Sequence, residues 1–384
     1  MIRVGIPVVI HDNAWMGGLN YFLSLLSVIN EYNEKELEVF VLTNRSDIFN
    51  NSYRKHIKVI QADFLLNKSE RVRNLCRHFE TDIRLAYYSK IYKLDVITHA
   101  LPGKRFTANT LYWMPDFQHC YLPKLFSDIE IENRNKNIEL VGNRCSNILL
   151  SSHAAESDFR QFYPHLGHVK SHVLNFTPNI EIESIKKHKN KNKQNNISEN
   201  FFYVPNQFWV HKNHDVIIDA LSHLPPEVKI YCTGNTSDIR NPEHFKNIEK
   251  KIINSGLKDR FVVLGLVDRN EMISLLLNCL AVINPSYFEG WSSTVEEAKC
   301  LGKKLILSDI PVHREQAPID ALYFPAEDPI SLANHLKNVW QNRDEEKQRE
   351  KARYIESIKQ HQLSREIFAK KYQSIVHAML TAKN

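Results

Sequence analysis

The feature of this sequence that most limits its possible folds is a repeated alternation of short β-rich runs and amphipathic helical patterns. In the first half, strand patterns at 3–10, 37–42, 96–98, 111–114, 147–151 and 172–175 are interspersed with helical patterns such as 20–30. The alternation resumes at residue 201 and continues through 308. Strands that alternate with helices form βαβ units and largely parallel sheets. The sequence therefore predicts an α/β protein.

A polar segment separates the two sets of βα units. Between 186 and 200 the chain is almost entirely Lys, Asn, Gln, Ser and His, with Ile197 as the single apolar residue. Such a segment cannot offset its ordering entropy by burying surface, so we expect an exposed linker. We predict two Rossmann-like domains, 1–180 and 201–364, joined by a linker at 181–200 and facing each other across a cleft. A helix at 365–384 is predicted to pack back on the first domain.

Composition and charge limit the function and the location. The 384-residue chain is 43% hydrophobic and 24% charged, and its formal charge of +6 is too mild to require a nucleic-acid partner. Its six cysteines are widely spaced without a C-x-x-C pair, so we expect reduced core residues. The first residues do not resemble a signal peptide, and no apolar run approaches the roughly 18–20 residues of a membrane span. We expect a cytoplasmic location, with contact at the inner face of a membrane left open.

The segment 284–298 is the richest in chemically useful side chains. An apolar strand is followed by a turn that carries Glu289, and a helix begins a few residues later. Hydroxyl side chains there can cap the helix, and its free N–H groups and positive dipole end suit a diphosphate. Glu297 lies about one turn inside, where its carboxylate can accept hydrogen bonds from a ribose. The alternative is that both glutamates are ordinary acids favoured by the helix dipole. The residues that we predict to bind such a diphosphate-containing ligand, the donor of the reaction inferred below, are Gly290, Trp291, Ser292, Ser293, Thr294 and Glu297.

This segment resembles the donor site of a known enzyme family. The E-x7-E spacing from Glu289 to Glu297, followed by the patterns at 298–303 and 305–309, is similar to that of retaining glycosyltransferases of family 4, within glycosyl transferases group 1. The resemblance implies the GT-B architecture, with 1–180 as the acceptor-binding domain and 201–364 as the nucleotide-sugar donor-binding domain. It also implies that Glu289 contacts the donor sugar, that Glu297 binds the ribose, and that the intervening amides hold phosphate or sugar. Common members read G-x-P between the glutamates, where this chain has Ser292-Ser293-Thr294. The departure concerns sugar recognition more than phosphate binding.

A second element, at 204–214, opens the same domain. A strand ends, a loop follows, and Lys212 begins a helix, where it can stabilise the charge of a leaving diphosphate. An isolated lysine at a helix start is usually solvated. Family members usually carry an arginine a few residues earlier, where this chain has Asn206 and Gln207. We predict Lys212 as a catalytic and donor-binding residue and Asn206 and Gln207 as donor-binding residues. We expect Lys212→Ala to reduce turnover far more than stability.

Two elements of the first domain add weaker signals. Gly17-Gly18 resembles the glycine-rich loop that lets the N-terminal domain approach the donor phosphates, although such a turn can simply join strand to helix. The absence of G-x-G-x-x-G argues against a nicotinamide dinucleotide site. Asp116 and His119 follow a predicted strand, and many relatives have His-Asp where this chain has Pro115-Asp116. We predict Asp116 and His119 as catalytic residues, with a buried structural role for the histidine as an equal alternative.

Together these features predict a metal-independent hexosyltransferase, and the family resemblance implies that it retains the anomeric configuration. D-x-D, H-E-x-x-H, G-x-S-x-G and the Walker lysine loop are missing, so we expect no essential metal or other cofactor. The resemblance implies transfer from GDP-mannose or a UDP-sugar to a glycan hydroxyl, in O-antigen, lipopolysaccharide or capsule assembly. A basic and aromatic stretch at 68–93 either contacts anionic lipid, which favours a lipid-linked glycan acceptor, or is a solvated face. Two alternatives are a sugar-nucleotide epimerase of the same architecture and a non-catalytic nucleotide-sugar-binding protein.

Overall fold

The protein folds into two compact units, each with its own sheet. The computed structural model describes residues 1–10, 16–33, 36–49, 56–104, 106, 108–145, 147–180 and 199–381. One unit comprises Met1–Cys120, Ser127–Asn179 and Leu363–Asn384, and the other comprises Tyr121–Phe126 and Ile180–Gln362. Most of the linker predicted at 181–200 lies outside the described residues.

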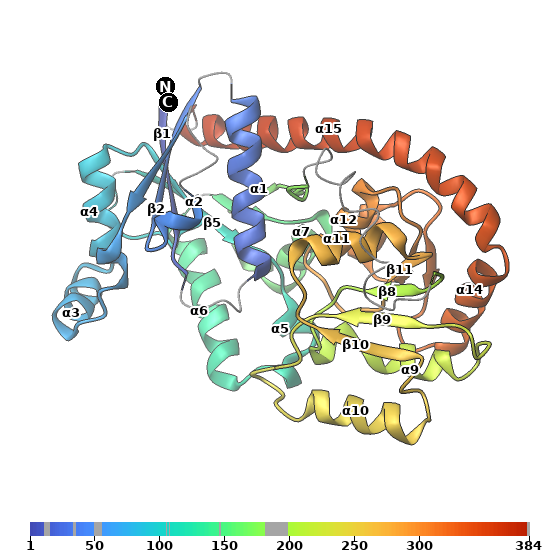
Figure 1. Cartoon of the computed structure of the whole chain (residues 1–384). Coiled ribbons are helices and arrows are strands. Elements are labelled where there is room, and N and C mark those ends of the chain that lie inside the picture. Colours follow the sequence, from blue (N-terminus) through green and yellow to red (C-terminus); the bar gives the residue numbers. More distant parts are fainter. Residues whose placement is uncertain are drawn as a thin grey trace. The chain divides into compact units, whose positions relative to one another are not determined.

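The first unit is built on a seven-stranded parallel sheet of order β3-β2-β1-β4-β5-β6-β7 (Figure 1). Its strands are β1 (Ile2–Val8), β2 (Leu37–Thr43), β3 (Ile57–Gln61), β4 (Val96–Thr98), β5 (Asn109–Met114), β6 (Asn147–Leu150) and β7 (Lys170–Val173). Its helices are α1 (Met16–Tyr32), α2 (Ser46–Phe49), α3 (Glu70–Phe79), α4 (Ile83–Tyr92), α5 (Gln118–Tyr121), α6 (Asp128–Arg144) and α7 (His153–Phe162). The apolar run of β2 is buried at every position except Glu38, as expected for a strand inside a parallel sheet.

The second unit is built on a six-stranded parallel sheet of order β10-β9-β8-β11-β12-β13. Its strands are β8 (Phe202–Val204), β9 (Ile230–Thr233), β10 (Phe261–Gly265), β11 (Ala281–Asn284), β12 (Leu305–Ser308) and β13 (Leu322–Phe324). Its helices are α9 (His214–Leu221), α10 (His244–Asn254), α11 (Arg269–Asn278), α12 (Ser293–Cys300), α13 (Pro311–Gln316) and α14 (Pro329–Gln341), with a short 3₁₀ turn η5 at Val210–Lys212. All four residues of β11 are buried, and the strand ends at Asn284.

The last helix, α15 (Arg343–Thr381), contributes to both units and is drawn in red in Figure 1. Its final part belongs to the first unit, where Phe368 and Tyr372 are buried in one core cluster with Leu25 of α1. The Tyr372 hydroxyl lies 2.9 Å from Oγ1 of Thr98, at the end of β4. The end of the chain therefore completes the core of the unit in which the chain begins.

The predicted α/β class with two largely parallel sheets is confirmed. Strand β4 has the bounds expected from the sequence, and the other strands predicted in the first half differ by a few residues at their ends. Strands β3 and β13 were not predicted. Helix α15 begins at Arg343 instead of at 365. No helix in the described part of the chain has the length and apolar composition needed to span a bilayer.

Candidate functional site

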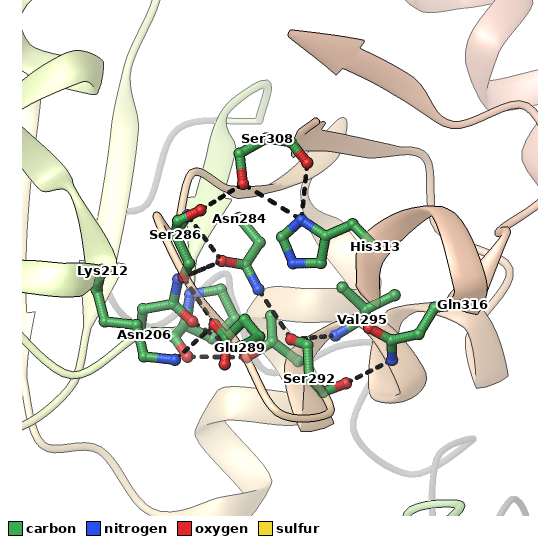
Figure 2. Close-up of polar contacts among 12 residues, drawn as sticks. Asn206, Lys212, Asn284, Ser286, Glu289, Ser292, Val295, Ser308, His313 and Gln316 are labelled. Atoms are coloured by element: carbon green, nitrogen blue, oxygen red, sulfur yellow. Dashed lines mark hydrogen bonds and ion pairs between the residues drawn. The ribbon is translucent and has the colours of Figure 1, made fainter. Parts of the chain in front are cut away.

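A network of polar side chains in the second unit lies where three neighbouring strands end. Strands β8, β11 and β12 are adjacent in the sheet. Asn206 follows β8, Asn284 ends β11 and Ser308 ends β12. Figure 2 shows their side chains converging with those of the loops that follow. The carboxyl edge of a parallel sheet is where α/β proteins bind ligands, so this edge is the candidate site.

Two predicted residues form a buried ion pair at this edge. Lys212, at the end of η5, donates from Nζ to Oε1 of Glu289 over 2.6 Å, and their side chains are 13% and 10% exposed. Burial is the largest single influence and opposes ionisation of Glu289. The charge and the hydrogen bond of Lys212, with contributions from His211 and His313, together outweigh it, and the pKa of this carboxyl falls to about 2. At neutral pH the pair is therefore a carboxylate and an ammonium. Because an ammonium has three N–H donors, Lys212 keeps further donors for a ligand.

Asn284 connects the loops that follow β8 and β11. It is fully buried, and its Nδ2 donates to Oγ of Ser292 over 2.8 Å. Its Oδ1 accepts from Nδ2 of Asn206 over 3.1 Å and from Oγ of Ser286 over 2.7 Å. The Ser286 hydroxyl also lies 2.7 Å from Oε1 of Glu289, so it can donate to either acceptor. Asn284 thereby holds Asn206, Ser286 and Ser292 in fixed positions around the ion pair.

The start of α12 faces this network. Ser292 is the N-cap and accepts from the backbone N–H of Val295 over 3.4 Å, as the sequence predicts. Gln316 donates from Nε2 to the Ser292 carbonyl and to Oε1 of Glu296, both over 2.9 Å. The hydroxyl oxygen of Thr294 lies 3.2 Å from Oδ1 of Asn206. The first N–H groups of a helix lack intrahelical partners and favour anions, so the start of α12 can bind phosphate.

Glu297 is paired with a cation that the sequence analysis did not single out. Its side chain is 9% exposed, and its Oε1 accepts from Nη1 of Arg269 over 2.5 Å. Arg269 is the first residue of α11, and its side chain is 40% exposed. The two residues are 28 positions apart in the chain, a separation that no local spacing rule connects. A diol bound by Glu297 would therefore also lie near a guanidinium.

His313, in α13, is a further residue that the sequence analysis missed. Its ring is fully buried, and Nδ1 lies 2.9 Å from the carbonyl oxygen of Ser308. A carbonyl can only accept, so Nδ1 carries the proton, and burial lowers the pKa of the ring. Nε2 is then a buried acceptor, and it has no hydrogen-bond partner among the residues that the structure describes. Figure 2 shows the ring beside the network around Glu289.

The remaining predicted site residues of the second unit are Gln207 and those near the turn before α12. Gln207 uses Oε1 to accept from the backbone N–H of Asn235 over 2.7 Å, so its side chain supports a loop. Gly234 precedes that residue with φ +148°, and a Cβ there would collide with the Asn206 carbonyl. Three further predicted residues lie partly exposed between Glu289 and the body of α12: Gly290, Trp291 and Ser293.

The predicted residues of the first unit lie outside this network. Gly17 and Gly18 are in the first turn of α1, not in a loop before it, and a Cβ on Gly17 would meet open space. Asp116 caps the N–H of Gln118 over 3.1 Å. His119 is 2% exposed, its Nε2 lies 3.3 Å from Oδ1 of Asn135, and burial lowers its pKa. The contacts of His119 are those of a core residue.

The sequence profile of one family matches this second unit. The family is described as glycosyl transferases group 1, and the match covers residues 184–361. The chain carries a glycosyl transferases group 1 domain. The Lys212–Glu289 pair and the start of α12 lie inside the matched region.

Two curated relatives resemble parts of this chain. The O-antigen chain mannosyltransferase RfbU of Salmonella typhimurium is 29% identical over 144 residues, which are 37% of this chain and 39% of that protein. The D-inositol 3-phosphate glycosyltransferase of Xylanimonas cellulosilytica is 25% identical over 127 residues, 33% of this chain and 30% of that protein. The matches thus span well under half of either relative.

Solved structures resemble this chain over nearly its whole length. The Anabaena protein HepE, solved with UDP and glucose, has a TM-score of 0.68 at 15% identity, covering 99% of this chain and 100% of that one. WaaG, a glycosyltransferase involved in lipopolysaccharide biosynthesis, has a TM-score of 0.63 at 13% identity, covering 97% and 99%. These likenesses establish the predicted GT-B fold.

Proposed function

We propose that this protein is a glycosyltransferase that takes its sugar from a nucleotide diphosphate. The observation that carries the proposal is the buried Lys212–Glu289 pair beside the start of α12, inside the group 1 domain. This arrangement combines an ammonium, a carboxylate and unpaired helix N–H groups, which suit the leaving diphosphate and the hydroxyls of a sugar. The names of the relatives support it, since RfbU is a mannosyltransferase and HepE was solved with UDP-glucose.

Each site residue has a distinct role in the proposed reaction. Glu289 accepts hydrogen bonds from the donor sugar, and Glu297 accepts them from the ribose. The free donors of Lys212 and the first amides of α12 stabilise the charge that develops on the leaving diphosphate. The bond from the anomeric carbon to the acceptor oxygen forms as its bond to phosphate breaks. The departing phosphate oxygen takes the acceptor proton on the same face, which retains the anomeric configuration.

The identities of the sugar donor, the acceptor and the pathway are also proposals. We infer a hexose from GDP-mannose or a UDP-sugar, a glycan hydroxyl as acceptor, and a part in surface-polysaccharide assembly of the O-antigen type at the cytoplasmic side of the membrane. RfbU and WaaG, both named for such pathways, support this inference. Metal independence is proposed because Lys212 and the helix amides already supply positive charge to the diphosphate.

A donor panel tests the proposal. The purified full-length chain is incubated with GDP-mannose, UDP-glucose and UDP-galactose, with and without a chelator, and released nucleoside diphosphate is measured. We expect release from one donor that a chelator does not reduce. Conversion of the sugar with no transfer to an acceptor would favour the epimerase alternative. No turnover of any donor, together with tight binding of one, would favour a non-catalytic binding protein.

The surface of α3 and α4 supports a membrane contact. On these helices Leu75, Tyr87 and Ile91 are 44%, 52% and 52% exposed, among exposed basic residues such as Arg71 and Arg73. Exposed apolar side chains beside cations are the pattern of an interfacial helix. We propose that this surface lies on anionic phospholipid, where each basic residue near the surface contributes about 1 kcal/mol.

Vesicle flotation measures this contact. We expect the protein to float with phosphatidylglycerol vesicles at low salt, to float less at high salt, and to stay behind with neutral phosphatidylcholine. Arg71→Glu with Arg73→Glu should abolish flotation, whereas the matched reversal of Lys246 and Lys250 on α10 should not. If the wild-type chain stays at the bottom of the gradient with both vesicle types, the proposal is contradicted.

A further inference from the structure

His313 is a buried titratable residue to which the proposed reaction gives no role. It lies in α13, five positions after the end of β12, and its ring is fully buried beside the network of Figure 2. Its Nε2 has no hydrogen-bond partner among the residues that the structure describes. A buried acceptor without a partner costs stability, and an apolar side chain of similar size would not carry this cost. The contribution of this histidine therefore lies at its other nitrogen, Nδ1.

Nδ1 of His313 holds the last residue of β12. Its N–H is shared between the carbonyl oxygen of Ser308, 2.9 Å away, and the hydroxyl oxygen of the same residue, 3.3 Å away. The Ser308 hydroxyl accepts from His313 and therefore directs its own proton elsewhere. It donates to the carbonyl oxygen of Ser286 over 2.6 Å. The imidazole thus fixes the direction in which Ser308 donates.

The contacts continue from Ser286 to Glu289. Ser286 is fully buried, and its hydroxyl lies 2.7 Å from Oε1 of Glu289. Figure 2 shows the succession from the ring of His313 through Ser308 and Ser286 to this part of the site. The ring and both serines are fully buried, so water cannot replace a hydrogen bond that is lost among them.

These contacts leave one oxygen of Glu289 for a ligand. The ammonium of Lys212 and the hydroxyl of Ser286 both contact Oε1, over 2.6 and 2.7 Å. Oε2 accepts no hydrogen bond from the residues that the structure describes. Two contacts on the same oxygen, from different elements, fix the direction in which the other oxygen points. Lys212 supplies one of these contacts, and the two serines connect the other to His313.

We propose that His313 is a positioning residue of the transfer reaction, which acts through the two serines to hold Glu289 with Oε2 toward the donor sugar. The inference rests on the proposed function, to which it adds the residue that orients the sugar-binding carboxylate. The diphosphate is bound by Lys212 and the start of α12, outside this line of contacts. Loss of the imidazole should therefore weaken the binding of the sugar and leave the binding of the nucleotide unchanged.

Two amide variants distinguish the nitrogens of the ring. The amide of asparagine reaches the position of Nδ1, whereas the amide of glutamine reaches that of Nε2. His313→Asn therefore keeps a donor for Ser308, and His313→Gln and His313→Leu do not. The matched control is His335→Leu on α14. Nε2 of His335 lies 3.0 Å from the carbonyl oxygen of Tyr323, so this change removes a similar imidazole-to-carbonyl contact from the same unit.

Calorimetry with the full chain and with GDP-mannose, UDP-glucose, GDP and UDP measures the effect. We expect His313→Leu and His313→Gln to bind the preferred nucleotide sugar about tenfold more weakly than the wild type, and its nucleoside diphosphate within about twofold of the wild type. Donor turnover should fall in the same two variants. His313→Asn should recover both quantities toward the wild-type values, and His335→Leu should change neither.

The alternative is that the ring only packs the core. In that case the asparagine, glutamine and leucine variants would lose affinity equally, or the nucleotide sugar and the nucleoside diphosphate would be affected equally. Either result, or unchanged sugar binding in His313→Leu, would overturn the inference. All measurements are made well below the melting temperature of each variant, so that unfolding does not contribute.

Ser308→Ala tests the same contacts without altering the ring. It removes the hydroxyl that donates to Ser286, so it should reproduce the selective loss of sugar binding even if the His313 variants fold poorly. The double variant with His313→Leu should bind the sugar no more weakly than either single variant, because both changes break one line of contacts. Additive losses would overturn the inference.

The wild-type chain separates this inference from the proposed function. Donor turnover by the wild type with unaltered sugar binding in Ser308→Ala and His313→Leu would remove the positioning role alone. Failure of the wild type to bind any nucleotide sugar would remove the proposed function and the positioning role with it.

Discussion

Replacing Lys212 with methionine is expected to lower turnover of the nucleotide sugar by about 10²–10³-fold, the usual effect of removing one group that stabilises a leaving anion. The same change should destabilise the second unit. Glu289 is buried and its ionised form depends on Lys212, so the variant leaves a buried carboxylate without its partner. Breaking such a pair from one side costs about 3–5 kcal/mol. The expectation that Lys212→Ala affects turnover far more than stability therefore changes, because both quantities should fall.

The double variant with Lys212→Met and Glu289→Gln separates the two effects. It removes both charges and keeps the shapes of the side chains, so its melting temperature should recover toward the wild-type value. Its turnover should stay low, because neither the cation for the diphosphate nor the carboxylate for the sugar is restored. Recovery of turnover along with stability would show that the pair acts only in folding.

A matched control lies in the same unit. Lys251 pairs with Asp215 and Asp219 over 3.1 and 2.8 Å, but its side chain is 31% exposed and lies outside the network of Figure 2. Lys251→Met should change both the melting temperature and the turnover little, since exposed ion pairs contribute about 0–1 kcal/mol. Wild-type turnover in the Lys212→Met variant would contradict the proposed role of Lys212.

Much of the fold could be predicted from the periodicity of apolar residues along the sequence. The buried run of β11 and the helical pattern of α12 are strong local signals, so the position of the turn between them could be predicted. Strand β3 is short, partly exposed and at the edge of its sheet, and its pattern is correspondingly weak. The first part of α15 is rich in charged residues, which hides its helical period. Strong elements were found and weak ones were missed.

The candidate site could likewise be predicted from the sequence only in part. Lys212 and Glu289 could be named because each follows a strand end, and the order of the strands then brings them together. Asn284 ends a strand that reads as simply apolar, so its contact with Asn206 depends on β8 and β11 being neighbours. The pairing of Arg269 with Glu297 depends on how α11 packs beside α12, which no sequence spacing reveals.

Acidification should destabilise the protein because several buried histidines are held neutral. Burial lowers the pKa values of His211 and His214 to about 3, and the nearby charge of Lys212 adds to both shifts. In the unfolded chain these rings titrate near pH 6.5, so between about pH 6.5 and about pH 3 the unfolded state binds protons that the folded state does not. The stability present above pH 6.5 is therefore lost as the pH falls, at up to about 1.4 kcal/mol per pH unit for each ring.

His214→Phe isolates one of these rings. His214 is fully buried and stacks on Phe208 with centroids 4.2 Å apart, and neither ring nitrogen has a hydrogen-bond partner in the described ranges. Phenylalanine has a similar shape and nothing to protonate, so the variant should be at least as stable at neutral pH. Its melting temperature should then fall less steeply than that of the wild type between about pH 7 and about pH 5.

An exposed histidine of the same unit provides the control that separates the effect of burial from the loss of any histidine. His223 lies in the same unit but is exposed, so His223→Phe should leave the pH dependence of the melting temperature unchanged. An unaltered slope in His214→Phe would mean that the ring is protonated in the folded state, despite its burial. A reduced slope in His214→Phe alone would show that the packing around Lys212 requires this imidazole to be neutral, because its protonation would bury a second positive charge near that of Lys212.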